Sequence, residues 1–310
     1  MRLIAGPSNK PLASAISEIL DIPLANADFK SFSDEETLVD IHDNMRGEDV
    51  YIIQSTSRPA NQHFMELLIT LDAVKRSSAR RITAVVPYFG YARQDSKSAS
   101  RTPITAKLCA DLLTTAGADR VLTMDLHARQ IQGFFNIPAD NLFGIPVFVK
   151  DIKNRFNGDD LMIVSPDVGG VVRARALGKK LEADLAIIDK RREQANDSEV
   201  MNVIGNVEGR NCIIIDDMGD TAGTLVNGAQ ALVDNGAKSV HAYVTHGILS
   251  GPANERIDNS TALESLTITD TIRYPHNGEA CVKVRKVTVA PLFAKAIKRT
   301  HEETSISELF

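Results

Sequence analysis

At 310 residues and 33.8 kDa, the chain is too long for one average domain, and we expect two domains of roughly 150 residues. Its hydrophobic content of 43% excludes a disordered chain, and its net charge of -5, with the charges interspersed, gives no support for binding to nucleic acid or to a membrane surface. Three cysteines without disulfide or zinc spacing, no signal-peptide pattern and no apolar run near roughly 18 residues predict a cytoplasmic protein.

Short β-branched runs alternate with helix-like segments along the whole chain. This alternation is typical of a mostly parallel sheet with helices on both faces. The expected strands are 2–5, 50–55, 82–87, 121–126, 161–165, 185–189, 212–215 and 240–245. The expected helices are 61–77, 103–116, 168–181, 221–235 and 291–300.

The segment 103–116 carries helix signals at both ends. Pro103 occupies the expected first helical position, and Gly117 provides the expected stop. Apolar residues recur between them at Ile104, Leu108, Leu112 and Leu113. The most polar stretch of the chain, KRREQANDSE at 190–199, is instead expected to form a mobile loop.

The two halves of the chain have a similar design. In the first half the strand VLTMDL precedes His127, and in the second half the strand CIII precedes Asp216 and Asp217. The joins AGADRVLTMDL and NGAKSVHAYVTHG are also alike. These similarities suggest an internal duplication with domains at 1–145 and 146–310, although doubly wound folds in general share such joins.

The stretch IIIDDMGDTAGTL, residues 213–225, places two acids beside a loop suited to phosphate. In an open α/β sheet the ligand binds beyond the carboxyl ends of the strands. The loop 220–224 offers backbone N–H groups, hydroxyls and a helix end to a phosphate. Asp216 and Asp217 would repel that phosphate unless they face neutral hydroxyls of the same ligand, as in a phosphorylated sugar. The alternative is a strand that ends in surface acids before an ordinary capped helix.

An apolar strand, two acids and Asp-Thr-x-Gly-Thr together resemble the fingerprint of the phosphoribosyltransferase fold, which binds ribose 5-phosphate units. Further motifs over essentially the whole chain resemble those of the ribose-phosphate diphosphokinases, which synthesise 5-phosphoribosyl diphosphate. They are PYFGYARQDSK (87–97), SRTPITAK (100–107), MDLHARQIQGFF (124–135), SPDVGGVVRAR (165–175), DKRR (189–192) and RTHEETSISELF (299–310). The resemblance implies two tandem phosphoribosyltransferase-like domains, the second binding the sugar, and leaves room for the C-terminal tail to pack back on the first.

The resemblance also implies a reaction. The anomeric hydroxyl of ribose 5-phosphate attacks the β-phosphorus of MgATP, and AMP leaves. The expected catalytic residues are Lys190 and Arg192, which would stabilise charge on the transferred group, although a basic run is more often a solvated face. The expected ribose 5-phosphate residues are Asp216, Asp217, Asp220, Thr221, Ala222, Gly223, Thr224 and Arg192.

ATP and its metal would be held mainly from the first half of the chain. The expected ATP-binding residues are Phe32, Asp34, Glu35, Glu36, Arg93, Gln94 and His127, the first four reaching into a neighbouring subunit. The expected Mg²⁺ residues are His127 and Asp167. Two positions depart from the family: Glu35 stands where many relatives have glycine, and Asn136 where relatives often have aspartate, although His127 and Asp140 remain.

The resemblance to the phosphate-activated class further implies regulation and assembly. Inorganic phosphate or ADP would bind a regulatory site, and the chain would form a homohexamer built from dimers. The candidate regulatory residues are Arg46, Ser78, Arg101, Ser305 and Ser307.

Two rival functions stay open on the sequence. A nucleobase phosphoribosyltransferase would share residues 213–225 but has no reason to keep Arg93, Gln94 and His127 in a separate first domain. A non-catalytic regulatory homologue would share the fold but is expected to show damage in the catalytic or sugar loop, and both loops read intact.

Overall fold

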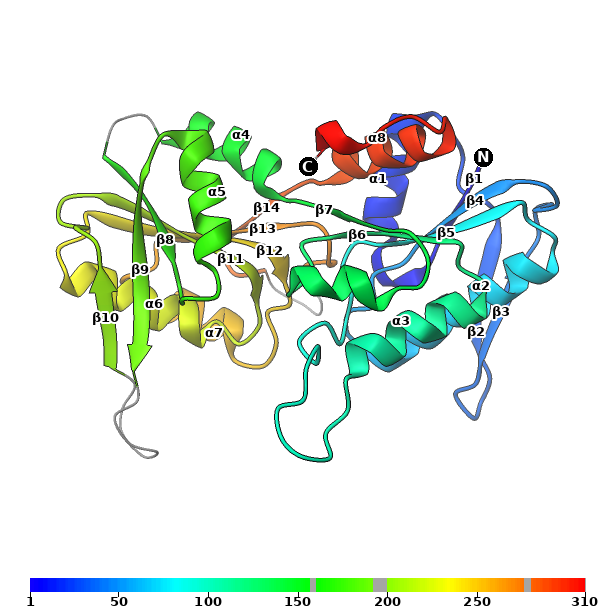
Figure 1. Ribbon diagram of the computed structural model, residues 1–310, viewed down its shortest axis with the longest axis horizontal. Helices are drawn as coiled ribbons and strands as arrows, with labels where there is room; N and C mark the ends of the chain where they lie inside the picture. Colours follow the sequence, from blue (N-terminus) through cyan, green and yellow to red (C-terminus); the bar gives the residue numbers. More distant parts are fainter. Residues whose placement is uncertain (157–159, 192–199, 276–279, 310) are drawn as a thin grey trace. The chain divides into compact units, whose positions relative to one another are not determined.

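A computed structural model describes residues 1–156, 160–191, 200–275 and 280–309 of the chain (Figure 1). The chain divides into two compact units. Unit 1 contains Met1–Phe143, Thr271–Arg273 and Thr288–Phe310, and unit 2 contains Gly144–Asp270 and Tyr274–Val287. Each unit is built on a largely parallel sheet flanked by helices, as the alternating sequence pattern predicts.

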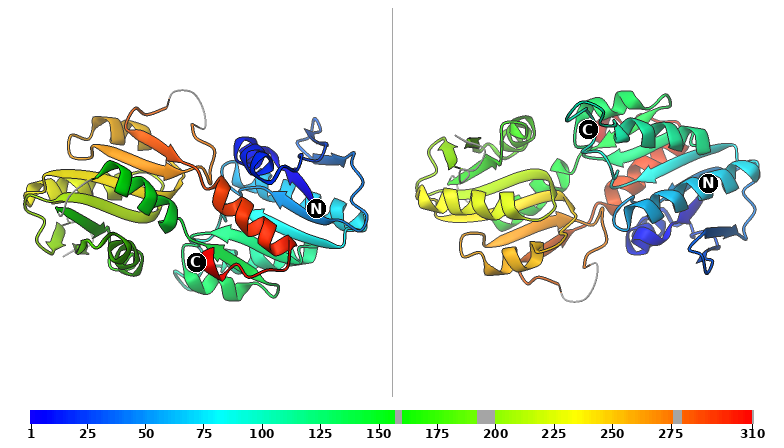
Figure 2. Two further views of the ribbon diagram at one scale, coloured as in Figure 1. Left: turned by 90° about the horizontal axis from the view of Figure 1, so that it is seen from above. Right: turned by 90° about the horizontal axis from the view of Figure 1, so that it is seen from below.

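Unit 1 has a five-stranded parallel sheet and a separate hairpin. The sheet order is β1 (Arg2–Ala5), β4 (Asp49–Ile53), β5 (Arg81–Val86), β6 (Arg120–Met124) and β7 (Ala139–Leu142). The antiparallel hairpin pairs β2 (Ala27–Ser31) with β3 (Thr37–Ile41). One face of the sheet is covered by α1 (Lys10–Leu20) and α8 (Ala290–His301), which lie side by side, and the other by α2 (Ala60–Arg76) and α3 (Thr105–Ala116) (Figure 2).

Unit 2 has a seven-stranded sheet that is parallel except at one edge. The order is β10 (Val200–Ile204), β9 (Asp184–Arg191), β8 (Leu161–Ser165), β11 (Asn211–Gly219), β12 (Ser239–Gly247), β13 (Ser265–Thr269) and β14 (Val284–Val287), with β10 antiparallel to β9. The helices of one face are α4 (Ile145–Arg155) and α5 (Val171–Leu181), and those of the other are α6 (Gly223–Asp234) and α7 (Ala253–Asn259).

Strand β11 shows why this sheet carries helices on both sides. Its residues are apolar without interruption from Cys212 to Ile215, and successive side chains point to opposite faces. Ile213 and Ile215 pack with α4 and α5, whereas Cys212 and Ile214 pack with α6 and α7. The buried strand therefore fixes the position of the residues that follow it.

The expected strands and helices are all present, with shifts at their ends. One correction concerns Pro103, because α3 begins at Thr105 and Ile104 is its N-cap. Gly117 ends this helix as predicted, with a φ of 124°. Leu108 on the same helix is 56% exposed, and the buried face is formed instead by Ala106, Cys109, Ala110 and Leu113.

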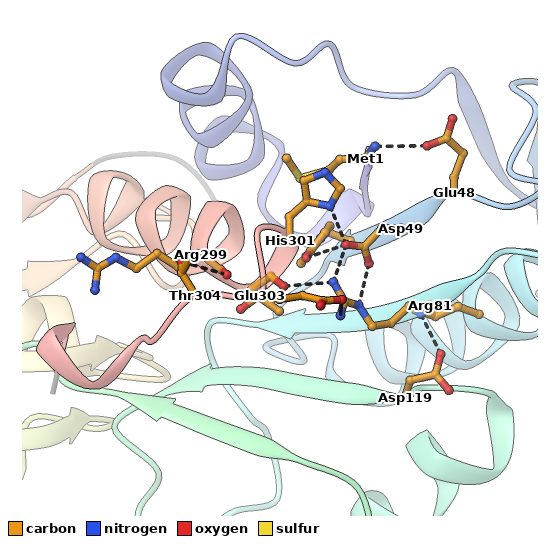
Figure 3. A network of polar contacts seen from close by, with 12 residues as sticks. Met1, Glu48, Asp49, Arg81, Asp119, Arg299, His301, Glu303 and Thr304 are labelled. Carbon is orange, nitrogen blue, oxygen red and sulfur yellow. Dashed lines mark hydrogen bonds and ion pairs between the residues drawn. The ribbon is translucent and has the colours of Figure 1, made fainter.

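The last helix is held in unit 1 by a buried acid (Figure 3). Arg81 binds both carboxylate oxygens of Asp49, at 3.0 and 2.6 Å, and its Nη2 also donates to the carbonyl of Thr300 at 3.0 Å. His301 Nδ1 lies 2.7 Å from Asp49, and the Tyr51 hydroxyl donates to it at 3.0 Å. Although burial opposes ionisation, the hydrogen bonds from Arg81 and His301 hold the pKa of Asp49 below its usual value.

Among the described residues, no helix is both long enough and apolar enough to cross a membrane.

Candidate active site

Two adjacent acids lie within the strand β11. The sequence predicts that this strand stops at Ile215, but it continues to Gly219 and pairs with β12 along this extension. Its pairing with β8 ends at Ile214, so Asp216 and Asp217 lie beyond the carboxyl end of that neighbour. They therefore occupy the edge where ligands bind in parallel α/β sheets.

Both acids contact one arginine that the sequence analysis did not single out. Arg173 Nη1 lies 3.2 Å from Oδ1 of Asp216 and 3.5 Å from Oδ1 of Asp217. Burial, and next the negative charge of Asp217, raise the pKa of Asp216 to about 8, while Arg173 acts in the opposite direction. Arg173 belongs to the motif SPDVGGVVRAR, but the spacing of residues in this motif does not indicate that Arg173 contacts β11.

Replacing Asp216 with asparagine is expected to remove a pH dependence of stability. Because its pKa is raised by folding, the folded protein keeps a proton that the unfolded chain loses above about pH 4. The wild type should therefore lose stability as pH rises toward about 8, whereas the variant lacks this loss. Thermal unfolding measured across this range should show a Tm advantage of the variant that grows with pH. The exposed Asp234 on α6 gives the control, Asp234→Asn, which should follow the wild type throughout.

The predicted phosphate-binding segment 220–224 contains the loop between β11 and α6 and the start of that helix. Ala222 is its buried N-cap residue and has a φ of 60°, in the left-handed region, and α6 begins at Gly223 rather than at the predicted Thr221. Thr224 lies in the first turn of this helix, whose N-terminus carries partial positive charge. The acids and the phosphate-binding candidates thus follow one another along a single strand-loop-helix connection, as the sequence predicts.

Asp167 lies in the loop between β8 and α5. Its Oδ1 accepts a hydrogen bond from the backbone N–H of Gly170 at 2.8 Å, and its carbonyl accepts one from Ser165 Oγ at 2.6 Å. The side chain is exposed, and α5 begins at Val171 rather than at the predicted Val168. The loop therefore holds this carboxylate at the same end of the sheet as Asp216, because β8 and β11 are parallel neighbours.

Lys190 lies near the end of β9, where its backbone pairs with Met201 of β10. Arg192 and most of the predicted loop 190–199 lie outside the described residues. The catalytic role of Lys190 and Arg192 therefore remains a prediction.

In unit 1, His127 follows the strand β6. That strand ends at Met124, before the predicted Leu126, and Asp125 then adopts a φ of 39°. The backbone N–H of Leu126 donates to the side chain of Asn141 on β7 at 3.1 Å. This turn leaves His127 exposed at the carboxyl end of the sheet.

Asp140 does not lie beside His127. Its carboxylate is in an ion pair with Arg120, the first residue of β6, whereas His127 follows the last residue of that strand. Asn136, the other position of interest here, is exposed. The carboxylate of Asp140 is therefore held near the start of β6, away from the turn that carries His127.

The loop with Arg93 and Gln94 is attached to the start of α3. The Gln94 carbonyl accepts the backbone N–H of Ala106 at 3.1 Å, and its side-chain oxygen accepts the Thr105 hydroxyl at 2.5 Å. Both Arg93 and Gln94 are exposed. The backbone and the side chain of Gln94 thus connect this loop to the start of α3.

Residues 32–36 form the tip of the hairpin β2–β3. The Phe32 N–H donates to the Glu36 carbonyl at 2.8 Å, and the Glu36 N–H donates to Asp34 Oδ1 at 3.2 Å. Phe32 is 55% exposed, which suits an aromatic side chain that stacks on a ligand. Glu35 has a φ of 70°, a conformation in which glycine is favoured, so the tip keeps its turn although the residue is glutamate.

The two metal candidates, His127 and Asp167, are compatible with a cation whose ligands come largely from the phosphates of a bound substrate. No cluster of three or more histidine, cysteine or acidic side chains suited to a metal occurs within the described parts of the chain. Mg²⁺ usually keeps several waters and binds one or two carboxylates together with substrate phosphates. An exposed carboxylate such as Asp167 meets this requirement, whereas the imidazole of His127 is a less typical ligand.

The regulatory candidates lie in three parts of unit 1. Arg46 and Ser78 are close in space, because the backbone N–H of Gly47 donates to the Ser78 carbonyl at 2.9 Å. Ser305 and Ser307 share a hydrogen bond of 3.0 Å, and Arg299 holds the Ser305 carbonyl. Arg101 lies in the loop before α3, with a φ of 67°.

Unit 2 places two adjacent acids, Asp216 and Asp217, and a loop suited to binding phosphate at the carboxyl end of a largely parallel sheet. This arrangement is typical of an α/β protein of the phosphoribosyltransferase type. The family model described as the N-terminal domain of ribose phosphate pyrophosphokinase matches residues 1–117, and a phosphoribosyl synthetase-associated domain matches residues 182–310. The chain belongs to the ribose-phosphate pyrophosphokinase family.

Similar proteins cover the full chain. Ribose-phosphate pyrophosphokinases of Granulibacter bethesdensis and Caulobacter vibrioides are 60% and 59% identical over 310 and 312 residues, spanning all of both chains. The crystal structure of phosphoribosylpyrophosphate synthetase from Mycobacterium smegmatis is 38% identical with a TM-score of 0.92, covering 97% of this chain and 99% of that one. The predicted fold of two phosphoribosyltransferase-like domains is thereby confirmed.

Proposed function

We propose that the protein transfers the diphosphoryl group of MgATP to the anomeric hydroxyl of ribose 5-phosphate. The products are 5-phosphoribosyl 1-diphosphate and AMP, and the former supplies nucleotide, histidine and tryptophan biosynthesis. The observation that carries this proposal is the intact strand-loop-helix connection from Asp216 to Thr224 in a chain related along its whole length to ribose-phosphate pyrophosphokinases.

Unit 2 supplies the sugar site. The ribose hydroxyls donate to Asp216 and Asp217, and the 5-phosphate accepts from the loop that begins at Asp220. Asp217 is buried and Asp216 is partly buried beside Arg173, so hydrogen bonds from a bound sugar to these two acids are shielded from water. A phosphate at the start of α6 gains from the positive end of that helix.

Unit 1 supplies the ATP site. Arg93 offers a charged donor and Gln94 an amide, while His127 lies at the carboxyl end of the same sheet. The hairpin tip with Phe32, Asp34, Glu35 and Glu36 would serve the adenine of a neighbouring subunit. That role agrees with the exposure of Phe32 and requires an oligomer, which we propose to be a homohexamer built from dimers.

The proposed reaction depends on groups that offset negative charge. ATP and ribose 5-phosphate bring many negative charges together, so Lys190 and Arg192 stabilise the charge that develops on the transferred group. His127 and Asp167 would hold Mg²⁺, which offsets phosphate charge when bound. The chain orients the anomeric hydroxyl toward the β-phosphorus without a covalent enzyme intermediate. Inorganic phosphate would activate the enzyme through Arg46, Ser78, Arg101, Ser305 and Ser307.

Phosphorus NMR of the purified protein with ribose 5-phosphate, ATP and Mg²⁺ tests the proposal. We expect AMP and a new diphosphate-bearing sugar, with no ADP, and a chelator should abolish the reaction. Unchanged ATP would overturn the proposal for this protein acting alone. Adding 5-phosphoribosyl diphosphate with nucleobases would then distinguish a phosphoribosyltransferase from a non-catalytic homologue.

A further inference from the structure

Three consecutive backbone carbonyl groups where β11 leads into the loop 220–222, here called the phosphate loop, accept hydrogen bonds from one segment, residues 249–256. The backbone N–H of Leu249 donates to the Gly219 carbonyl at 3.0 Å, and that of Ser250 donates to the Asp220 carbonyl at 2.9 Å. Arg256 Nη1, on α7, donates to the Thr221 carbonyl at 3.0 Å. The segment thus engages every peptide carbonyl between β11 and Ala222.

These bonds determine which way the loop N–H groups point. In a planar trans peptide, the C=O and the N–H of the same unit point in opposite directions. Three carbonyls directed at residues 249–256 therefore turn the N–H groups of residues 220, 221 and 222 away from that segment. Ala222 then adopts a left-handed conformation, and successive N–H groups arranged around such a residue form a concave anion site.

The side chain of Asp220 also lies on the side of the loop that faces residues 249–256. The Ser250 hydroxyl donates to its carboxylate, in addition to the backbone bond between these residues. A carboxylate on the phosphate side would repel the ligand, and Ser250 holds it on the side of residues 249–256. The loop therefore carries its negative groups on one side and its N–H groups on the other.

We propose that Arg256 and Ser250 are positioning residues that preset the loop for the 5-phosphate of ribose 5-phosphate. The inference rests on the proposed function and adds to it two residues that need not touch the substrate. Arg256 has the larger role, because its guanidinium is the donor for the carbonyl immediately before the left-handed residue Ala222. Ser250 retains its backbone bond to the loop when its side chain is removed.

Arg256 can be substituted without opening a void in the core. Its side chain is exposed and lines a cavity of about 570 Å³ between α6 and α7, together with Glu255 and Asn259. Arg256 Nη1 would lie 3.4 Å from a Cβ atom placed on Gly223, so the guanidinium lies against the loop itself. Glu255 lines the same cavity and is also exposed, so it provides a matched control.

Steady-state kinetics of Arg256→Ala, Arg256→Lys, Ser250→Ala and Glu255→Gln test the proposal. Arg256→Ala should raise the KM for ribose 5-phosphate about tenfold, the usual effect of losing one well-placed hydrogen bond, with kcat and the KM for ATP changed less than about twofold. Arg256→Lys should recover part of the loss, and Ser250→Ala should give a smaller increase. Glu255→Gln should behave as wild type.

The outcomes separate this inference from the proposed function. If the wild type makes no 5-phosphoribosyl diphosphate, the proposed function fails and this inference fails with it. If the wild type is active but Arg256→Ala keeps its KM for ribose 5-phosphate, only the positioning role is overturned. If Arg256→Ala instead lowers the Tm and raises the KM values for ribose 5-phosphate and ATP equally, Arg256 has a purely structural role. That result would also overturn the positioning role.

Discussion

Replacing Lys190 with alanine is expected to lower kcat by about 10²- to 10³-fold, with little change in either KM. The lysine should act on charge that develops only as the diphosphoryl group is transferred, so its loss weakens the transition state more than the substrate complex. The rate of AMP formation at saturating ribose 5-phosphate and ATP measures this effect. Lys190→Arg should retain part of the rate because it keeps the charge.

Arg191 provides the control for this experiment. It is the next residue of the chain and carries the same charge, but it is not among the expected catalytic residues, Lys190 and Arg192. We therefore expect Arg191→Ala to remain within about threefold of the wild type, well short of the loss expected when a transition-state donor is removed. A Lys190→Ala enzyme that kept most of its kcat would show that the basic segment is only a solvated surface.

The second large effect is expected at the sugar site. Asp217→Asn should raise the KM for ribose 5-phosphate by about 10- to 100-fold, because a hydrogen bond to a charged group contributes roughly 1.5–3 kcal/mol. The side chain of Asp217 is only 6% exposed and lies 3.5 Å from Arg173, so water cannot easily replace the lost charge. The KM for ATP should stay the same, since the proposed ATP residues lie in unit 1.

Initial rates over a range of ribose 5-phosphate concentrations measure the Asp217→Asn effect. Asp234→Asn changes an exposed acid of the same unit and should leave both KM values unaltered. Equal increases in KM for both substrates would contradict a role confined to the sugar. Together, a kcat effect at Lys190 and a KM effect at Asp217 would distinguish stabilisation of the reaction from binding of the substrate.

The sequence predicts the fold best where the local pattern is strong. The buried run 212–215 and the alternation of strands with helices indicate a parallel sheet without reference to any distant residue. Shorter or more polar elements were missed, among them the edge strands β10 and β14 and the hairpin β2–β3. In these elements pairing with a neighbouring strand determines the structure, and the local pattern is weak.

In the candidate site too, residues that are consecutive in the sequence were predicted, whereas residues that meet only in the folded chain were not. The order of Asp216, Asp217 and the loop is visible in the sequence because these residues are consecutive. Arg173 and Arg256 were not predicted, since each meets the site only after the chain folds back on itself.

The return of residues 288–310 to unit 1 affects how the chain can fold during synthesis. The ribosome makes the N-terminus first, and domains usually begin to fold in that order. Unit 2 has all its residues once Val287 is made, whereas unit 1 still lacks α8 and the contact of His301 with Asp49. The unit that starts first is therefore completed last, and a chain cut before Thr288 would leave α1 without its neighbouring helix on the sheet of unit 1.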